Sequence, residues 1–157
     1  MINQTKSPVK TAVRFNRDKK MWQARNTRTT DCASRQEAML VALGSDHPEM
    51  AAKVVQLAAA HGKTITNGLL KAASLIVHGK VYSNGEVGSQ SRADVYHKTR
   101  FDGVTKKYSC SCEARVWDAQ LGKICAHCLA QHLAYLLALD LPAPPIPFAG
   151  EPVVINN

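Results

Sequence analysis

The chain has 157 residues, of which 45% are hydrophobic and 20% are charged, and its formal net charge is +8. A chain of this size can bury a modest hydrophobic core, so the composition indicates a globular protein. No apolar run approaches the ~20 residues of a membrane span, and the polar start MINQTKSPVK lacks the apolar segment of a secretory signal. We therefore expect a cytoplasmic protein (nuclear in a eukaryote) with reduced cysteines.

The positive charge is concentrated at the N-terminus. Residues 1–30 contain eight basic side chains and one acidic side chain, whereas residues 31–157 contain 12 basic and 11 acidic ones. A confined basic block predicts a polyanionic partner, and the alternative is a solvated arm. The candidates for phosphate contact in this block are Arg14, Arg17, Lys19, Lys20, Arg25 and Arg28.

The first predicted elements form a β-hairpin in TAVRFNRDKKMWQARN. Val13 and Phe15 alternate with polar residues, a turn follows near Asp18, and Trp22 begins a return strand with Ala24 in phase. The following NTRTTDCA can supply a third short strand. We expect Trp22 to pack in the hairpin, and its alternative role is a stacking contact with nucleic acid.

Three helices are predicted after the hairpin. SRQE is a capping box with Ser34 as the N-cap, and it opens a helix that Gly44 is expected to end. A second helix starts near Asp46 and ends at Gly62, with alanine and valine on one face, Val55 among them. A third helix covers residues 66–78 and is stopped by the glycine that follows.

The pattern then changes to strands. NG at 84–85 and DG at 102–103 are turn signals, and β-prone runs lie near Val81, Tyr96 and Tyr108. The hairpin between Tyr96 and Tyr108 is a second, smaller basic surface, with Lys98 and Arg100 as candidates for contact with nucleic acid.

The chain returns to a helical pattern at Cys125 and ends in a proline-rich segment. The helix has an apolar stripe, and LPAPPIPFAGEPVV cannot be helical and is expected to be an extended tail. This tail can pack back onto the domain or serve as a ligand for a partner. The stripe consists of Leu129, Leu133, Leu136 and Leu137.

Four of the five cysteines lie in CSCEARVWDAQLGKICAHC. Cys110 and Cys112 are two apart in a β-prone stretch, so their side chains point to one face. If Cys125 precedes the helix and His127 lies in its first turn, both can join that pair around one cation. Three thiolates and one imidazole form a closed tetrahedral set typical of one structural Zn2+.

Alternatives to this assignment exist. Cys128 also has zinc spacing from Cys125, although it is in phase with the apolar face of the helix. His132 is either a group that contacts a metal ligand or a histidine on the helix face, and Cys32 is expected to be a core or partly exposed thiol. A catalytic cysteine would need a base and an orienting group, and no distinctive set of that kind is recognisable, so we expect no enzymatic activity.

The C-x-C pair, the spacer and the C-x-H pair that leads into a helix resemble the SWIM-type zinc finger. LIVHGKVYS before the cluster and LAQHL after it are similar to the beginning and end of such domains, so the resemblance covers roughly residues 70–137. It implies a zinc-stabilised ββα unit that binds DNA or protein partners. The N-terminal region also resembles the three-stranded sheet and helix of phage-integrase arm-binding and AP2 domains, which place a sheet face in the major groove.

These features together predict an α+β protein. We expect a basic hairpin plus helix at 1–44, a helical segment at 45–79, a SWIM-like zinc module at 80–139 and an extended tail at 140–157. The expected function is non-enzymatic binding of nucleic acid, DNA rather than RNA, with zinc organising the C-terminal module. The alternative is a zinc-stapled interaction subunit of a larger protein complex.

Overall fold

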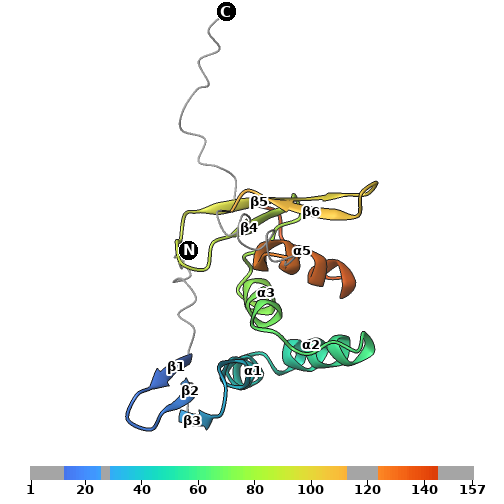
Figure 1. Ribbon diagram of the computed structural model, residues 1–157. Coiled ribbons are helices and arrows are strands. Elements are labelled where there is room, and N and C mark those ends of the chain that lie inside the picture. The colour runs from blue at the N-terminus through green and yellow to red at the C-terminus, as the bar shows by residue number, and fades with distance from the viewer. Residues whose placement is uncertain (1–12, 26–28, 113–123, 145–157) are drawn as a thin grey trace, which may run out of the picture.

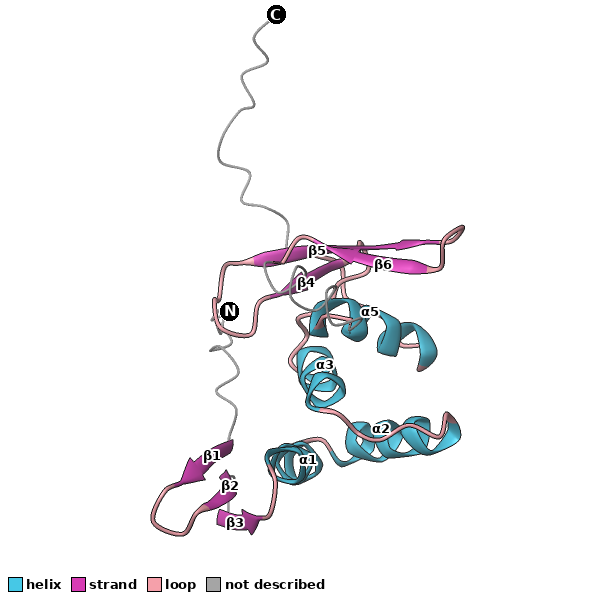
Figure 2. Ribbon diagram, in the orientation of Figure 1, coloured by secondary structure: helices cyan, strands magenta, loops and turns pink. Residues whose placement is uncertain are grey.

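The computed structural model describes residues 13–25, 29–112 and 124–144 and confirms an α+β fold. Two three-stranded antiparallel sheets lie at opposite ends of a group of helices, as Figure 1 shows by chain position and Figure 2 by secondary structure. The predicted tail beyond residue 144 lies outside the described residues. Within the described part of the chain, no helix has the length and apolar character to cross a membrane.

The N-terminal sheet has the order β1-β2-β3, with β1 at Val13–Asn16, β2 at Met21–Arg25 and β3 at Thr29–Cys32. The Asn16 side chain accepts hydrogen bonds from the backbone N–H groups of residues 18 and 19, which fixes the turn between β1 and β2. Trp22 pairs with Phe15 on one side and with Cys32 on the other. The predicted hairpin and third strand are both confirmed.

Helix α1 (Arg35–Asp46) packs against one face of this sheet. Its N-cap is Ser34, whose Oγ accepts the backbone N–H of Glu37 at 3.1 Å, as the capping box predicts. The residues buried between sheet and helix are small: Ala24, Cys32 and Ala38. Because alternate residues of a strand point to opposite faces, the other face of the sheet is left free of α1.

The corner between α1 and α2 (Pro48–Ala60) corrects the predicted boundaries. The prediction that Gly44 ends the first helix is wrong, because α1 continues past it to Asp46. A Cβ at Gly44 would lie 3.7 Å from the Ala51 side chain of α2. His47 caps α1 at its end and precedes α2, with no side-chain cap bond. Val55, predicted on the buried face of α2, is exposed.

Helix α3 (Asn67–Val77) lies at the centre of the core. Thr66 caps it through a hydrogen bond from Leu69 N–H, and Gly79 follows it with a positive φ of 65°, as predicted. Its Leu70 and Leu75 side chains are fully buried. They join a single cluster with residues of α1, α2, the C-terminal sheet and α5. One core therefore spans the predicted segments 1–44, 45–79 and 80–139.

The C-terminal sheet consists of β4 (Glu86–Gly88), β5 (Tyr96–Asp102) and β6 (Lys107–Cys110) in that order. The predicted turns at 84–85 and 102–103 both lie at strand junctions. Gly85 has a φ of 86°, and a Cβ there would lie 2.8 Å from the Thr99 carbonyl oxygen, so the turn requires glycine. Val81 bridges to Val87 and both are buried.

Helix α5 (Ala126–Leu136) packs along α3 and beneath the C-terminal sheet. Ala130 and Leu133 belong to the main core, whereas Leu136, predicted in the apolar stripe, is exposed. The helix buries alanines at positions that the leucine pattern did not indicate. After α5 the chain passes the C-terminal sheet, where Pro142 accepts a backbone hydrogen bond from Ser83.

Candidate metal centre

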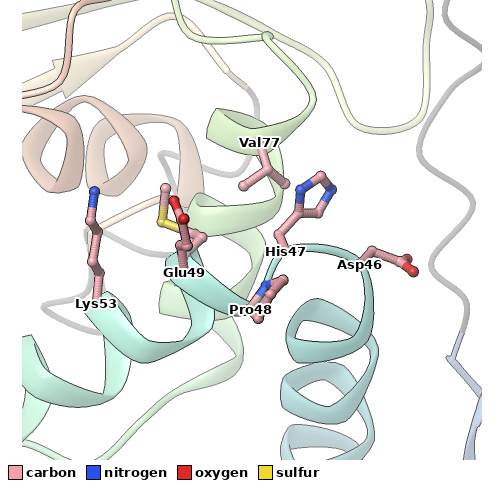
Figure 3. A pocket seen from close by; sticks show the side chains of 7 residues that line it. Asp46, His47, Pro48, Glu49, Lys53 and Val77 are labelled. Carbon is pink, nitrogen blue, oxygen red and sulfur yellow. The ribbon is translucent and has the colours of Figure 1, made fainter.

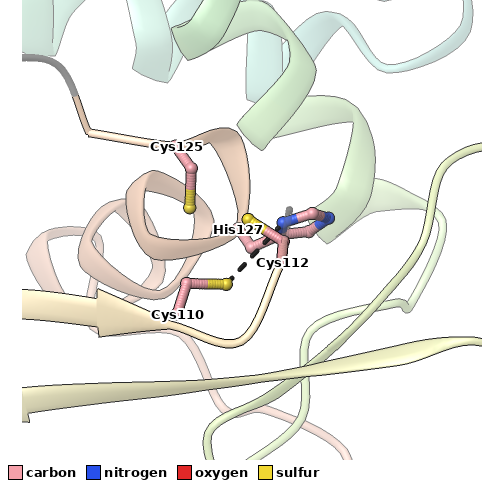
Figure 4. A group of neighbouring side chains, drawn as sticks. All are labelled: Cys110, Cys112, Cys125 and His127. Carbon is pink, nitrogen blue, oxygen red and sulfur yellow. Dashed lines mark hydrogen bonds between the residues drawn. The ribbon is translucent and has the colours of Figure 1, made fainter. Parts of the chain in front are cut away.

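The end of β6 and the start of α5 bring the four predicted ligands together. Cys110 is the last residue of β6, and Cys112 lies in the bend that follows it. Cys125 has an extended backbone and forms the N-cap of α5, and His127 lies in the first turn. Figure 4 shows the four side chains converging on one point from these two segments. Cys125 thus precedes α5, as the ligand spacing requires.

The geometry of the group fits one ion. The sulfur and nitrogen atoms of Cys110, Cys112, Cys125 and His127 all lie within 4.8 Å of one another. Sulfur ligands of a tetrahedral zinc ion lie about 3.8 Å apart, given Zn–S bonds of about 2.3 Å. The Cys110 Sγ and His127 Nδ1 atoms are already 3.9 Å apart (Figure 4). The group could thus hold one metal ion, and its soft sulfur donors favour zinc.

Two thiols of the group are disposed to ionise. Hydrogen bonds from the thiols of Cys110 and Cys128 hold the pKa of Cys125 well below its usual range. The backbone N–H of Cys128 also donates to Cys125 Sγ at 3.5 Å, and the start of α5 adds the partial positive charge of a helix N-terminus. The pKa of Cys110 is lowered as well. Thiolate is the form that binds a metal.

The other two members of the group hold protons in the metal-free protein. Burial and the neighbouring Cys110 thiol raise the pKa of Cys112 to about 12. Burial opposes a charged imidazole, but hydrogen bonds to Cys110 and Cys125 outweigh it and raise the pKa of His127 to about 9. A metal ion that binds all four groups would displace both protons.

Cys128 is placed differently from these four residues. It is buried on α5, and its thiol donates to the Ser109 carbonyl oxygen of β6 at 3.4 Å. Hydrogen bonding to Cys110 and Cys125 raises its pKa far above the usual range, so it remains a thiol. It does not belong to the set of four mutually close ligand atoms. Cys128 therefore acts as a hydrogen-bond donor that ties α5 to β6.

Aromatic groups surround the cysteines. Tyr108 packs against the buried thiols, and its hydroxyl lies 3.1 Å from His132 Nδ1. The sequence left two roles for His132, and in the structure its ring contacts Tyr108. The His127 ring lies 4.3 Å from the ring of His97, and both rings line a hollow of about 410 Å³ beside the cysteines. Cys112 also lines this hollow, so two of the four ligand residues border it.

The predicted nucleic-acid residues of the N-terminal sheet divide between its two faces. Arg14 pairs with Gln23, next to Trp22 in the strand, so Arg14 and Arg25 share the face away from α1 and both are exposed. Trp22 lies half-buried on the α1 side, with its ring 5.4 Å from that of Phe15. This position favours the packing role over the stacking role.

The turn between β1 and β2 carries the remaining described cations of the basic block. Arg17 and Lys20 are exposed there, while Lys19 Nζ forms an ion pair with the Asp31 carboxylate at 3.0 Å. Hydrogen bonds from Gln23 and Lys19 lower the pKa of Asp31. Lys19 is thus partly neutralised, a pairing that sequence spacing did not reveal. Arg28 lies outside the described residues.

The second basic surface lies at the other end of the molecule. Lys98 and Arg100 flank the buried Thr99 in β5, and both are exposed on the face turned away from α5. Lys98 lies opposite Glu86 in the register of β4 and β5. The sheets that carry the two basic surfaces are separated by the helical core (Figure 1).

A further hollow of about 390 Å³ lies at the corner of α1 and α2. Asp46, His47, Glu49 and Lys53 surround it with mixed charge (Figure 3). In the part of the chain that the structure describes, the Cys/His group is the one set of three or more residues whose ligand atoms converge. The corner hollow therefore offers no comparable metal site.

No protein-family model, curated protein or solved structure matches this chain. The group of three cysteines and one histidine is thus the observation that points to a zinc-binding module in the C-terminal part. The zinc assignment does not depend on a related protein, because the donor atoms themselves favour zinc.

Proposed function

We propose that this chain is a non-enzymatic zinc protein that binds nucleic acid, DNA rather than RNA, through its N-terminal sheet. The observation that carries the proposal is the convergence of three buried thiols and one imidazole between β6 and α5. The resemblance of C-x-C and C-x-H to SWIM-type zinc fingers supports the same assignment. Zinc in such a set joins a strand to a helix and stabilises the fold.

A structural role for the metal follows from the number of ligands. Catalytic zinc keeps one position open for water or substrate, whereas four protein ligands fill the tetrahedron. The group offers four ligand atoms, and Cys128 stands beside it as a further thiol. We therefore expect no hydrolytic or redox turnover from the bound ion.

The outer face of the N-terminal sheet supports contact with a nucleic acid. Arg14 and Arg25 are exposed on that face, with Arg17 and Lys20 in the adjoining turn. Each guanidinium or ammonium group that contacts a phosphate releases counterions and makes binding depend on salt. A three-stranded sheet backed by one helix is also the arrangement of the integrase arm-binding and AP2 domains that this region resembles, and those domains bind duplex DNA.

The decisive experiment measures salt-dependent binding of a DNA duplex by the full-length protein and by an Arg14→Gln, Arg25→Gln variant. If both side chains contact phosphate, the slope of log affinity against log salt should flatten by about 1.8, since each contact contributes about 0.9. Both residues are exposed, so the substitutions leave the core intact.

The matched control removes the same charge elsewhere. A Lys53→Gln, Lys63→Gln variant loses two exposed cations from the region of α2, distant in the fold from the N-terminal sheet face. It should bind DNA with an unchanged or slightly reduced slope. Equal slopes for all three proteins would contradict the proposal and support the interaction-subunit alternative.

A further inference from the structure

An aromatic pocket of about 480 Å³ lies between the β5–β6 hairpin and α5. Phe101 and Tyr108 line it from the hairpin, and His132 and Tyr135 line it from the helix. The volume is within the range of small-molecule sites. The pocket is separate from the predicted basic face of the N-terminal sheet, which lies at the opposite end of the molecule (Figure 1).

The inner wall of this pocket is held in place by ring contacts. The Tyr108 hydroxyl lies 3.1 Å from His132 Nδ1, and the two ring centroids are 5.5 Å apart. The Phe101 and Tyr108 rings lie 4.8 Å apart. Tyr108 also packs against the buried cysteines, so the cysteine cluster lies behind this wall.

The outer wall is open to solvent. Tyr135 is 78% exposed and Phe101 is 48% exposed, although both are large aromatic side chains. Exposed rings beside a fixed aromatic wall can stack with another planar ring. A packing role does not account for them, since Tyr135 in particular leaves most of its surface in water.

The charge of the pocket selects the kind of planar ligand. Among the described residues that line it, Lys106 is charged and none is a carboxylate. Arg100 and Lys107 alternate with Phe101 and Tyr108, so they lie on the other face of the hairpin and Lys106 supplies the positive charge of the pocket. The nearby Asp102 carboxylate accepts backbone hydrogen bonds from residues 104 and 105, which ties it to the turn. A ligand with an aromatic ring and a negative charge complements this site.

We propose that this pocket binds an unpaired nucleobase of a nucleic-acid strand, with the base on the exposed rings and a neighbouring phosphate at Lys106. Aromatic platforms next to cations are the means by which proteins hold single strands. A base inside a duplex cannot reach such a pocket, so the site distinguishes unpaired from paired segments. This inference rests on the proposed nucleic-acid function and adds a second contact to it.

The test uses the full-length, zinc-loaded protein and a fluorescein-labelled oligothymidine of about 12 nucleotides, a length within the usual site sizes of single-strand binders. Fluorescence anisotropy should show about 5- to 150-fold weaker binding for Tyr135→Ala, because a stacked base loses its platform. Tyr135→Phe should restore binding, since it keeps the ring. Lys106→Gln should flatten the salt slope by about 0.7, the value for one contact to a single strand.

Val104→Ala is the matched control. Val104 is 92% exposed at the tip of the same hairpin and does not line the pocket, so its replacement should leave affinity unchanged. Zinc content and circular dichroism should be the same for all variants, because every replaced side chain is exposed. Crosslinking of a 5-iodouracil oligonucleotide should map to Tyr135, Phe101 or Tyr108.

Three outcomes would overturn the inference. Unchanged single-strand binding in both Tyr135→Ala and Phe101→Ala, with duplex binding retained, would reject the pocket and leave the proposed function standing. Failure to bind either single strand or duplex would reject both. Binding of the oligonucleotide only after removal of residues 145–157 would identify the chain's own tail as the occupant.

Discussion

The two ends of this molecule are built alike and held together differently. Each has a three-stranded antiparallel sheet against one helix: β1–β3 on α1, and β4–β6 near α5. The N-terminal interface is filled by alanine side chains and one thiol, with Trp22 at its edge. The corresponding cluster at the C-terminal end consists of Cys110, Cys112, Cys125 and Cys128, with Tyr108 against it.

This difference shows how a small sheet can be stabilised in two ways. Strands of three to seven residues bury little apolar surface, so neither sheet is expected to be stable alone. The N-terminal sheet gains its stability from packing on α1. The C-terminal sheet gains part of its stability from α5, which is anchored in the main core, and we expect the remainder to come from a metal ion.

The largest expected effect is that of removing one ligand. Cys112→Ser should abolish zinc binding, and structural zinc sites contribute apparent free energies of about 10 kcal/mol or more. Because Ala130 and Leu133 of α5 belong to the main core, we expect β5, β6 and the first turn of α5 to lose hydrogen-exchange protection while α3 keeps it. Zinc analysis and residue-resolved hydrogen exchange measure both parts.

Cys32→Ala is the matched control for this variant, because it removes a buried thiol from the N-terminal end. It should retain zinc and leave exchange in β5 and β6 unchanged. Loss of protection throughout the chain in Cys112→Ser would contradict the idea that the two ends are stabilised separately.

The second prediction concerns pH. In the metal-free protein the imidazolium of His127 pairs with thiolates, so this contribution to folding is lost as pH rises through about 9. Metal binding has the opposite dependence, because zinc must displace protons from His127 and from Cys112, whose pKa is about 12. Between about pH 6 and pH 8, affinity should fall on the order of a hundredfold for each unit that pH decreases.

Competition with a chromophoric chelator measures this affinity across the pH range. A His127→Ala variant that still binds zinc weakly should show a shallower dependence, because one proton fewer is displaced. An affinity for zinc independent of pH would contradict the assignment of these two ligands.

The sequence predicted the elements with strong local signals. The capping box at Ser34, the helix stop at Gly79 and the turn at Gly85 are short-range features, and each lies where the pattern placed it. The ligand group followed from side-chain phase and from the requirement that Cys125 precede the helix. These arguments need only neighbouring residues.

Features that depend on tertiary packing were missed. Gly44 lies inside α1 and faces Ala51 of α2, a contact with no local signal. Leu136 is exposed because α5 buries its alanines against α3. The Lys19–Asp31 ion pair joins residues of the turn and β3, and the aromatic pocket joins a hairpin to a helix. The exposure of Phe101 and Tyr135 became apparent only in the structure, so no local pattern marked that pocket.

The third prediction disturbs the N-terminal end alone. Trp22→Ala removes a half-buried ring that contacts Phe15 and lies 5.7 Å from the Arg35 guanidinium. Loss of this packing should lower the free energy of unfolding by about 2 kcal/mol, less than for a fully buried aromatic residue. Urea denaturation measures the loss.

Zinc content should remain unchanged in Trp22→Ala. This variant disturbs the N-terminal end, whereas Cys112→Ser disturbs the C-terminal end. Phe15→Ala serves as the comparison, and it should cost less because that ring is more exposed. Loss of zinc from Trp22→Ala would show that the two ends depend on each other.

The smallest expected effect separates the fourth ligand from its neighbour. Cys128→Ala removes a thiol that donates to the Ser109 carbonyl oxygen, so it should cost about 1 kcal/mol of stability and keep the metal. The backbone N–H that donates to Cys125 Sγ remains in this variant.

His127→Ala should lose zinc or bind it far more weakly, since the Nδ1 atom of His127 lies 3.9 Å from Cys110 Sγ within the converging set. Metal analysis of the two variants side by side decides the assignment. Zinc loss in Cys128→Ala with retention in His127→Ala would make Cys128 the fourth ligand, because the metal would then draw its thiol away from Ser109.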